Sequence, residues 1–245
     1  MQILLYMIFL VAAYLIGSIP FGLIIVRLTT GKDIRQVESG RTGGTNAMRA
    51  AGFWAGLFTA ALDLLKGAAT AWLARYLFPD QYLMHVLAPV FAIIGHNYSI
   101  FLIERNEKGQ PRLRGGAGGA PSAGGAMGLW FPTILFTLPI GAGILYFVGY
   151  ASVATLSAPL VAALVFAYRA WIGAGPWEYI LYGILTEILL IIALLPNIRR
   201  LLNGTERVIG LRAQRKKARE AKNNSTQKLR RSPNHSSSSS SSSSS

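Results

Sequence analysis

Long apolar stretches, interrupted by short polar segments, cover most of the chain. Of the 245 residues, 52% are hydrophobic, and the runs 3–15, 82–94 and 180–195 carry few polar side chains. A hydrocarbon core about 30 Å thick is crossed by about 20 mostly apolar helical residues, and backbone groups in lipid must be satisfied internally. The pattern therefore predicts an all-α membrane protein with seven transmembrane helices. We place these helices at 3–26, 53–78, 83–103, 118–131, 133–150, 153–171 and 177–196.

The first apolar run predicts a retained helix and not a cleaved leader. No basic residue precedes the run, and it contains no clear small-residue cleavage site. Gly17, Pro20 and Gly22 lie within it, but glycine and proline are tolerated in membrane helices better than in soluble ones. We therefore expect this run to stay in the bilayer.

Basic residues cluster in three of the polar segments. Except for Lys66, Arg75 and Arg169, all 24 lysines and arginines lie within 27–50, within 104–114 or from 199 onward. With seven crossings these three segments fall on one side, which the positive-inside rule makes cytoplasmic. The N-terminus is then outside, and a fourth cytoplasmic turn falls at 149–155.

The composition changes abruptly after Leu202, to a basic polar stretch that ends in ten serines. Such a stretch buries too little apolar surface to fold alone. We therefore divide the chain into a helical membrane domain, 1–210, and a disordered cytoplasmic tail, 211–245. The formal net charge is +14, and a basic tail beside a membrane is attracted to anionic headgroups. We expect membrane lipids, and no nucleic acid, as its partners. The chain has no cysteine, which excludes disulfides and thiolate metal sites.

The segment 38–52, ESGRTGGTNAMRAAG, combines turn-forming residues with two arginines. Its glycines let successive N–H groups converge on a phosphate-like anion, and a helix beginning near Thr45 or Asn46 would add its positive end. The simpler alternative is an ordinary turn with Arg49 snorkelling to the membrane surface. Three more small-residue segments on the same expected side, 112–125, 149–155 and 196–206, favour one composite site.

Six motifs in order resemble the bacterial glycerol-3-phosphate acyltransferases that use acyl-phosphate. They read GSIPFG, GKDIRQVESGRTGGTNAMRAAG, LDLLKG, GHNYSIF, GGAGGAPSAGG and NIRRLLNGTE, and they extend nearly to Gly210. The resemblance implies a seven-helix enzyme of the bacterial cytoplasmic membrane with its active face in the cytoplasm. It also implies that the enzyme acylates glycerol 3-phosphate to lysophosphatidic acid without a metal or cofactor. The oligomeric state stays open.

The first loop of that family reads approximately SGNxGATNVxR. Ser39, Thr45, Asn46 and Arg49 match, and the resemblance implies that they bind glycerol 3-phosphate. Arg41 stands where the family has asparagine, and we count it among the substrate-binding residues. Gly44 replaces an alanine, which is a small change.

The second motif departs further from the family's GGKGVAT. Gly115, Gly116, Gly118 and Gly119 fit a phosphate-binding loop, but Ala117 stands where the family has lysine. Two nearby arginines are candidates to replace the lost charge, since guanidinium groups bind phosphate well. They are Arg112 and Arg114.

The third and fourth motifs also differ at single positions. Ser152 matches the first serine of RYVSLAS, whereas Gly149 replaces its arginine. The fourth motif, NxxRLLxGxE, is matched through Asn197, Arg200, Leu201, Leu202, Gly204 and Glu206. Leu194 stands where the family usually has histidine. Ser152 and Glu206 join Ser39 and Asn46 as the predicted catalytic residues.

Ionisable residues inside the predicted spans are expected to pair or to support the site. Asp63 and Lys66 lie i, i+3 on one helix face and match the family, as does His96. We assign all three a supporting role, with packing as the close alternative. Glu187 matches nothing in the family pattern.

The predicted reaction is direct attack of the glycerol hydroxyl on acyl-phosphate, because no Ser/His/Asp arrangement or HxxxxD acyltransferase box is present. Holding two reactants in register supplies about 7 to 11 kcal/mol of a barrier. Two alternatives remain at this stage: an impaired paralogue that binds a lipid phosphate without turnover, and a small transporter with broken helices. Against the transporter, the chain shows no inverted repeat.

Overall fold

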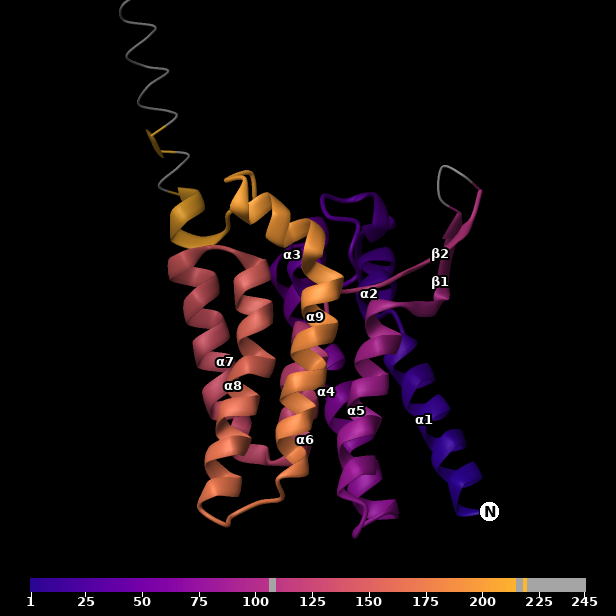
Figure 1. Ribbon diagram of the computed structural model, residues 1–245. Coiled ribbons are helices and arrows are strands. Elements are labelled where there is room, and N and C mark those ends of the chain that lie inside the picture. Colours follow the sequence, from indigo (N-terminus) through magenta and orange to yellow (C-terminus); the bar gives the residue numbers. More distant parts are fainter. Residues whose placement is uncertain (106–108, 215–217, 220–245) are drawn as a thin grey trace, which may run out of the picture.

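The structure, a computed structural model, describes residues 1–105, 109–214 and 218–219. Long helices run side by side and form a helical bundle (Figure 1). Within the described residues, five stretches are long and apolar enough to cross a bilayer, and a sixth helix is shorter but apolar. The five are Gln2–Thr30, Phe53–Leu77, Phe131–Val148, Ala151–Trp171 and Glu178–Leu202; the sixth is Tyr82–Asn97. The chain is therefore an integral membrane protein, and the count of seven spans stays a prediction.

The elements follow one another along the chain with short connections. The helices are α1 (Gln2–Ser18), α2 (Phe21–Thr30), α3 (Gly44–Ala51), α4 (Phe53–Leu77), α5 (Tyr82–Asn97), α6 (Gly119–Leu129), α7 (Ile134–Gly143), α8 (Ala151–Trp171) and α9 (Glu178–Leu202). Short helical turns occur at Ile34–Gln36 and Phe131–Thr133, and a π-helical turn, Ile144–Val148, extends α7. Two strands, β1 (Ser99–Arg105) and β2 (Pro111–Arg114), pair antiparallel.

The first predicted span is broken where the sequence has Ile19 and Pro20. Proline has no N–H to donate and disfavours a helical conformation in the residue before it. The chain accordingly leaves α1 after Ser18 and restarts as α2 at Phe21. Nζ of Lys66, from α4, lies 3.0 Å from the carbonyl oxygen of Ile19. The break is thus compensated by a donor from a neighbouring helix.

The third predicted span was wrong in its last part, because α5 ends at Asn97 and 99–105 form β1. This apolar stretch, SIFLI, is rich in β-branched and aromatic residues, which favour strands. Glu104 ties the hairpin to the first polar loop through Arg35, and its second carboxylate oxygen pairs with Arg114 of β2, each at 3.2 Å. The all-α prediction therefore holds for the bundle but not for this hairpin.

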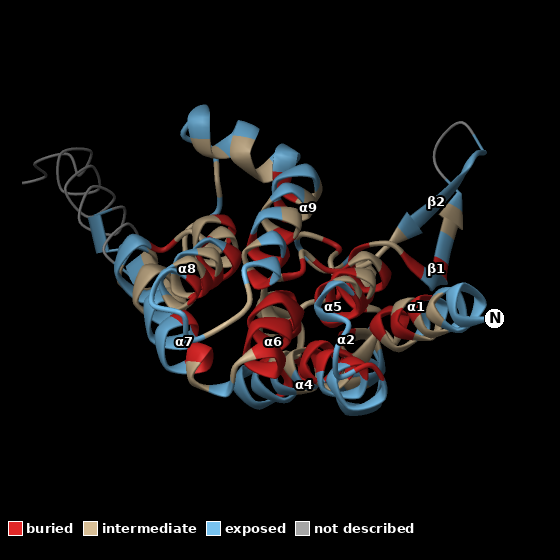
Figure 2. Ribbon diagram, turned by 60° about the horizontal axis from the view of Figure 1, so that its bottom comes forward, coloured by how far each residue is buried: buried red, intermediate tan, exposed pale blue. Residues whose placement is uncertain are grey.

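Helix α6 lies in the middle of the bundle and is buried almost throughout (Figure 2). Its small residues let α4 approach closely: a Cβ on Gly124 would lie 1.8 Å from the carbonyl oxygen of Leu64. Such small-residue contacts are the usual basis of tight helix packing in membranes. The hydroxyl of Tyr182, on α9, donates to the carbonyl of Ser122 at 2.6 Å and fixes α6 from the other side.

The polar connections gather at one end of the bundle. The segments 31–43, 98–105, 109–118, 149–150 and 203–214 lie at the upper end in Figure 1, whereas the N-terminus lies at the lower end. The first residues of the predicted tail, 211–214, are helical. Residues 215–217 and 220–245 lie outside the described residues, so the predicted domain boundary at 210 and the disorder of the tail stay predictions.

Candidate functional site

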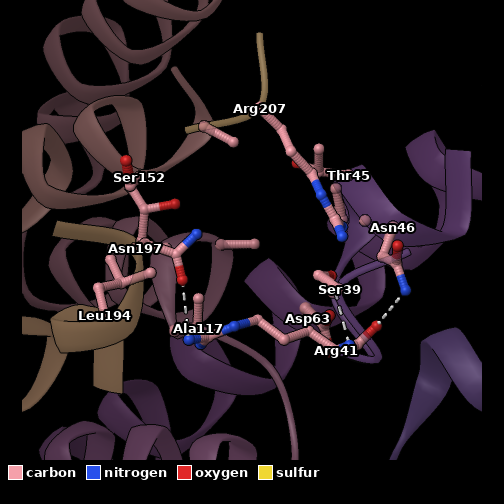
Figure 3. A pocket seen from close by; sticks show the side chains of 18 of the residues that line it. Ser39, Arg41, Thr45, Asn46, Asp63, Ala117, Ser152, Leu194, Asn197 and Arg207 are labelled. Atoms are coloured by element: carbon pink, nitrogen blue, oxygen red, sulfur yellow. Dashed lines mark hydrogen bonds between the residues drawn. The ribbon is translucent and has the colours of Figure 1, made fainter. Parts of the chain in front are cut away.

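A cavity of about 170 Å³ opens among these polar segments (Figure 3). All four segments that the sequence analysis brought together contribute to its wall. The sequence-predicted residues that line it are Ser39, Arg41, Thr45, Asn46, Arg49, Asp63, His96, Gly118, Gly119, Ser152 and Glu206. The predicted convergence of distant loops is therefore observed.

The first loop is shaped by side chains that satisfy its own backbone. Asp33 accepts from the N–H of Arg35 at 2.9 Å and caps the turn that begins there. Nδ2 of Asn46 donates to the carbonyls of Ile34, Val37 and Arg41 at 2.9–3.1 Å. Asn46 thus holds the loop against α3, and its buried Oδ1 is left without a partner among the described residues.

Helix α3 begins at Gly44, close to the predicted start, and directs its first turn at the cavity. The first N–H groups of a helix have no intrahelical acceptor and favour anions. Thr45 and Arg49 both line the cavity from this helix, and Ser39 lies opposite on the loop. Burial lowers the pKa of the Arg49 guanidinium, and the nearby Glu38 carboxylate opposes that shift. Arg49 stays charged, since arginine is not deprotonated in proteins.

Arg41 crosses the floor of the cavity from the first loop to α9 (Figure 3). Its Nη1 donates to the carbonyl of Gly116 at 3.3 Å, and its Nη2 donates to the carbonyl of Ala193 at 2.6 Å and to Oδ1 of Asn197 at 3.2 Å. Burial lowers the pKa of this guanidinium, and repulsion from Arg200 acts in the same direction. Of five N–H groups, three are donated to these described acceptors, which leaves two for a ligand.

In the second polar segment, 112–125, some glycines pack against α5 and others line the cavity. Gly115 and Gly116 lie against α5, where a Cβ would come within 2.1 Å of the His96 carbonyl oxygen and 1.9 Å of its Nε2, respectively. The N–H of Gly116 is donated to that carbonyl at 2.9 Å. These two glycines are therefore required by packing and do not line the cavity. Gly118 (φ +89°) caps α6, and Gly118 and Gly119 present its N-terminus to the cavity.

The structure does not bring Arg112 and Arg114 to the cavity. Arg112 is the cross-strand partner of Glu104 in the hairpin, and Nε of Arg114 lies 3.2 Å from the Glu104 carboxylate. Both were candidates to replace the charge missing at Ala117, and neither lines the cavity. The cation beside Ala117 is Arg41 instead (Figure 3).

Ser152 occupies the first turn of α8 and faces the cavity. Its side chain is buried, and its Oγ has no hydrogen-bond partner among the described residues. A buried polar group without a partner is costly unless a ligand or water completes it. The hydroxyl is thus placed to bind a polar ligand.

The fourth segment contributes more residues than the sequence analysis assigned. Nδ2 of Asn197 donates to Glu206 at 2.8 Å, and Nε of Arg200 lies 3.5 Å from the same carboxylate. Arg207 reaches back to Glu38 at 3.0 Å. Asn197, Arg200 and Arg207 all line the cavity. Asn197 and Arg200 stand at matched positions of the NxxRLLxGxE pattern, which was the available signal.

A buried charge cluster lies beneath the cavity. Nζ of Lys66 is 2.9 Å and Nδ1 of His96 is 3.4 Å from Oδ1 of Asp63. Asp63 and His96 line the cavity, whereas Lys66 points away toward the break between α1 and α2. The predicted i, i+3 pair is present, and it links the cavity to the bundle.

An apolar groove of about 530 Å³ adjoins the cavity between α4, α6, α7 and α8. The two spaces share the lining residues Thr45, Ala60, Gly119, Ala120, Ala151 and Thr155. Farther along, leucines, alanines and glycines line the groove, among them Leu64, Leu138 and Gly141. A polar cavity therefore opens directly into an apolar groove.

Comparisons with known proteins agree with this arrangement. The family model described as "Glycerol-3-phosphate acyltransferase" matches residues 7–204. The chain is 35% identical over 204 residues to "Glycerol-3-phosphate acyltransferase 2" of Moorella thermoacetica, which covers 83% of this chain and 97% of that protein. It is 36% identical over 205 residues to "Glycerol-3-phosphate acyltransferase" of Thermus thermophilus, with 84% and 96% covered.

Solved structures are similar as well. A crystal structure of PlsY (YgiH), described as an integral membrane glycerol 3-phosphate acyltransferase in its glycerol 3-phosphate form, superposes with a TM-score of 0.71 at 30% identity. The match covers 84% of this chain and 96% of that one. The lysophosphatidic acid form of the same protein superposes with a TM-score of 0.69. The chain therefore belongs to the glycerol-3-phosphate acyltransferase family.

Proposed function

We propose that this protein transfers a fatty acyl group from acyl-phosphate to the 1-hydroxyl of glycerol 3-phosphate, giving lysophosphatidic acid and inorganic phosphate. The observation that carries the proposal is the cationic cavity that opens into an apolar groove. A phosphate ester fits the first space, and a fatty chain fits the second. Four guanidinium groups line the cavity: Arg41, Arg49, Arg200 and Arg207.

The two phosphates would occupy opposite sides of the cavity. Ser39, Thr45 and Arg49, with the N-terminus of α3, would bind glycerol 3-phosphate. Gly118 and Gly119 at the N-terminus of α6, with Arg41, would bind the acyl-phosphate. The acyl chain would then enter the groove past Gly119, which lines both spaces. Hydrogen bonds between a guanidinium group and a phosphate are charge-assisted and stronger than those between neutral groups.

The reaction requires little covalent chemistry from the protein, because acyl-phosphate is already an activated anhydride. The glycerol hydroxyl oxygen attacks the acyl carbon, and the bond from that carbon to the phosphate oxygen breaks with its electron pair on phosphate. The departing phosphate takes the hydroxyl proton. The N–H groups at the start of α6 would stabilise the negative charge on the carbonyl oxygen. Ser152 and Glu206 would complete the wall that orients the reactants, while Asn46 holds the loop.

Arg41 would supply the cation that the family places at position 117. Its guanidinium donates to Gly116, the residue before Ala117, and keeps two N–H groups for the ligand. A planar fork binds phosphate in a different geometry from an ammonium group. Because Arg41 would supply the missing cation, we favour a protein that turns substrate over. The alternative is a paralogue that binds a lipid phosphate without reacting.

The orientation in the membrane follows from charge. The basic segments lie at the cavity end of the bundle, so the positive-inside rule would place the cavity in the cytoplasm and the N-terminus outside. The proposed location is the bacterial cytoplasmic membrane, where both substrates and membrane lipids would be available.

The test is an assay of the purified protein in lipid nanodiscs. We expect lysophosphatidate and inorganic phosphate in equal amounts from acyl-phosphate and glycerol 3-phosphate, and no product when an acyl thioester replaces acyl-phosphate. Ser152→Ala should lower turnover, whereas Ser157→Ala should not, because the Ser157 hydroxyl donates to the Ala154 carbonyl within α8. Binding of glycerol 3-phosphate without any lysophosphatidate would support the non-reacting paralogue instead.

A further inference from the structure

The hairpin leaves the bundle beside the last turns of α1. Helix α5 has 16 residues, which at about 1.5 Å per residue span about 24 Å, less than the hydrocarbon core of about 30 Å. The start of β1 is tied to the last turns of α1: the Tyr14 hydroxyl donates to the carbonyl of Tyr98 at 2.8 Å, and Ser99 Oγ donates to that of Ser18 at 2.6 Å. Helix α5 alone is therefore shorter than a typical hydrocarbon core, and the chain continues from it directly into β1.

The first part of the hairpin exposes an apolar surface. Ile100, Phe101 and Ile103 are 45%, 58% and 55% exposed, whereas Leu102 between them is 3% exposed and packs inward. Leu113, the cross-strand partner of Ile103, is 37% exposed. We call these four exposed residues (Ile100, Phe101, Ile103 and Leu113) the outer hairpin surface. The strands project sideways from the bundle beside α1 (Figures 1 and 2).

One backbone N–H of this surface is satisfied at the point where the strand pairing is interrupted. The strand register shifts between Ser99 and Ile103, so the residues between them oppose no residue of β2. The N–H of Phe101 nevertheless finds an acceptor in Ser99 Oγ at 3.2 Å. Unsatisfied backbone groups are costly in lipid, and this contact removes one of them at the residue that projects most.

Positive charge lies next to the apolar residues. Glu104 is occupied by Arg35 and Arg114, each at 3.2 Å. Arg105 is exposed on the same face of the hairpin as Ile103, whereas Arg112 pairs with Glu104 on the opposite face. Basic groups at a membrane surface are attracted to anionic lipids. Apolar side chains followed by an arginine match the order of environments that a chain meets as it leaves the hydrocarbon core.

We propose that the outer hairpin surface is an interfacial anchor that inserts into the membrane around the bundle, with Arg105 bound to anionic lipid headgroups. The hairpin lies outside the cavity, so this role is independent of acyl transfer. A bilayer fits better than a protein partner, because the surface continues the lipid-facing apolar residues of α1, such as Leu15, at the same depth.

The absence of cysteine from the sequence allows a direct measurement of depth. Single variants Phe101→Cys and Ile103→Cys would carry a nitroxide in vesicles of phosphatidylcholine with or without phosphatidylglycerol. Leu164→Cys, on the exposed face of α8, is the lipid control, and Lys32→Cys, beyond the end of α2, is the aqueous control. We expect the labels at 101 and 103 to collide more with oxygen than with an aqueous nickel complex, as at 164. The label at 32 should show the reverse.

The charge contribution is tested in the same background. Adding Arg105→Gln to Phe101→Cys should shift the label toward the aqueous reagent in vesicles that contain phosphatidylglycerol, and leave it unchanged in phosphatidylcholine alone. Aqueous accessibility at both 101 and 103 would overturn the anchor. Spin–spin coupling between labels of separate chains would also overturn it, since a second copy would then cover the surface. An unchanged depth after removal of Arg105 would overturn its assignment to lipid headgroups.

Discussion

Nη2 of Arg41 lies 3.2 Å from Oδ1 of Asn197, so a residue of the first polar loop is joined to the end of the last helix. The same guanidinium donates to the carbonyl of Gly116. One side chain therefore connects three of the four segments that form the cavity, and it does so beside Ala117, where the family has lysine.

Arg41→Ala should lower kcat/KM by about 100-fold, the usual loss when one donor to a developing charge is removed. The double variant Arg41→Asn, Ala117→Lys restores the family's pattern and should recover part of that loss. Steady-state kinetics of phosphate release measure both. Activity of Arg41→Ala within a few-fold of the unmodified protein would contradict the role assigned to this cation.

Arg49→Ala should raise the KM for glycerol 3-phosphate by about 10- to 100-fold, because hydrogen bonds to charged groups contribute about 1.5 to 3 kcal/mol. Arg27→Ala is the matched control, since Arg27 is exposed near the end of α2 and lies outside the cavity. Titration with glycerol 3-phosphate at saturating acyl-phosphate gives the KM of each variant. An equal response of both variants would show that only net charge matters.

Gly141→Leu should shorten the acyl chains that the protein accepts, because Gly141 lines the groove and a larger side chain there would fill it. We expect turnover of palmitoyl-phosphate to fall about 10-fold relative to octanoyl-phosphate, within the range that a few methylene groups produce. Gly143→Leu is the control on the same helix, since a Cβ at Gly143 meets no atom within 4 Å. A uniform loss for both chain lengths in Gly141→Leu would point to misfolding of α7.

Lys66→Met should destabilise the bundle by about 3 to 5 kcal/mol, because it leaves the Asp63 carboxylate buried without its 2.9 Å partner. The double variant Asp63→Asn, Lys66→Met should recover most of that loss. Thermal unfolding in detergent, followed by circular dichroism, provides the comparison. Equal stability of Lys66→Met and the unmodified protein would show that the pair is not needed for folding.

Asp33→Asn should destabilise the first loop at neutral pH, by less than about 1 kcal/mol for a partly exposed pair. The hydrogen bond from the Arg35 side chain lowers the pKa of Asp33 below its ordinary 3.8. A lowered pKa contributes stability above the unfolded value, and that stability is lost as the pH falls through the folded value. The difference in Tm between the two proteins should therefore vanish in strong acid. A difference that persists there would assign the effect to the N-cap alone.

The sequence predicted the architecture where hydrophobic periodicity and charge act over long stretches. The bundle, the grouping of polar segments at one end and the Asp63–Lys66 pair all follow from apolar run length and from the cost of charge in lipid. The hairpin was missed because the run through 99–103 is apolar in either conformation. The available sequence signal was its β-branched and aromatic composition, whereas the pairing of Glu104 with Arg35 and Arg114 is seen only in the structure.

The sequence also did not predict which long side chains reach the cavity. Arg112 and Arg114 are nearest to Ala117 in sequence, yet the hairpin directs them away. Arg41 is distant in sequence, and its place depends on how the first loop packs against α9, which no local pattern encodes. Asn197 and Arg200 were visible as motif positions, but their contacts with Glu206 required the fold.

The interruption between α1 and α2 has a consequence for engineering the scaffold. The Lys66 ammonium donates one of its three N–H groups to the Ile19 carbonyl, and it lies 2.9 Å from the Asp63 carboxylate. If Pro20 were replaced and the kink straightened, the Ile19 carbonyl would accept a hydrogen bond within a continuous helix. The Lys66 ammonium would then lose this acceptor. A redesign that joins α1 and α2 into one helix therefore has to change Lys66 on α4 as well.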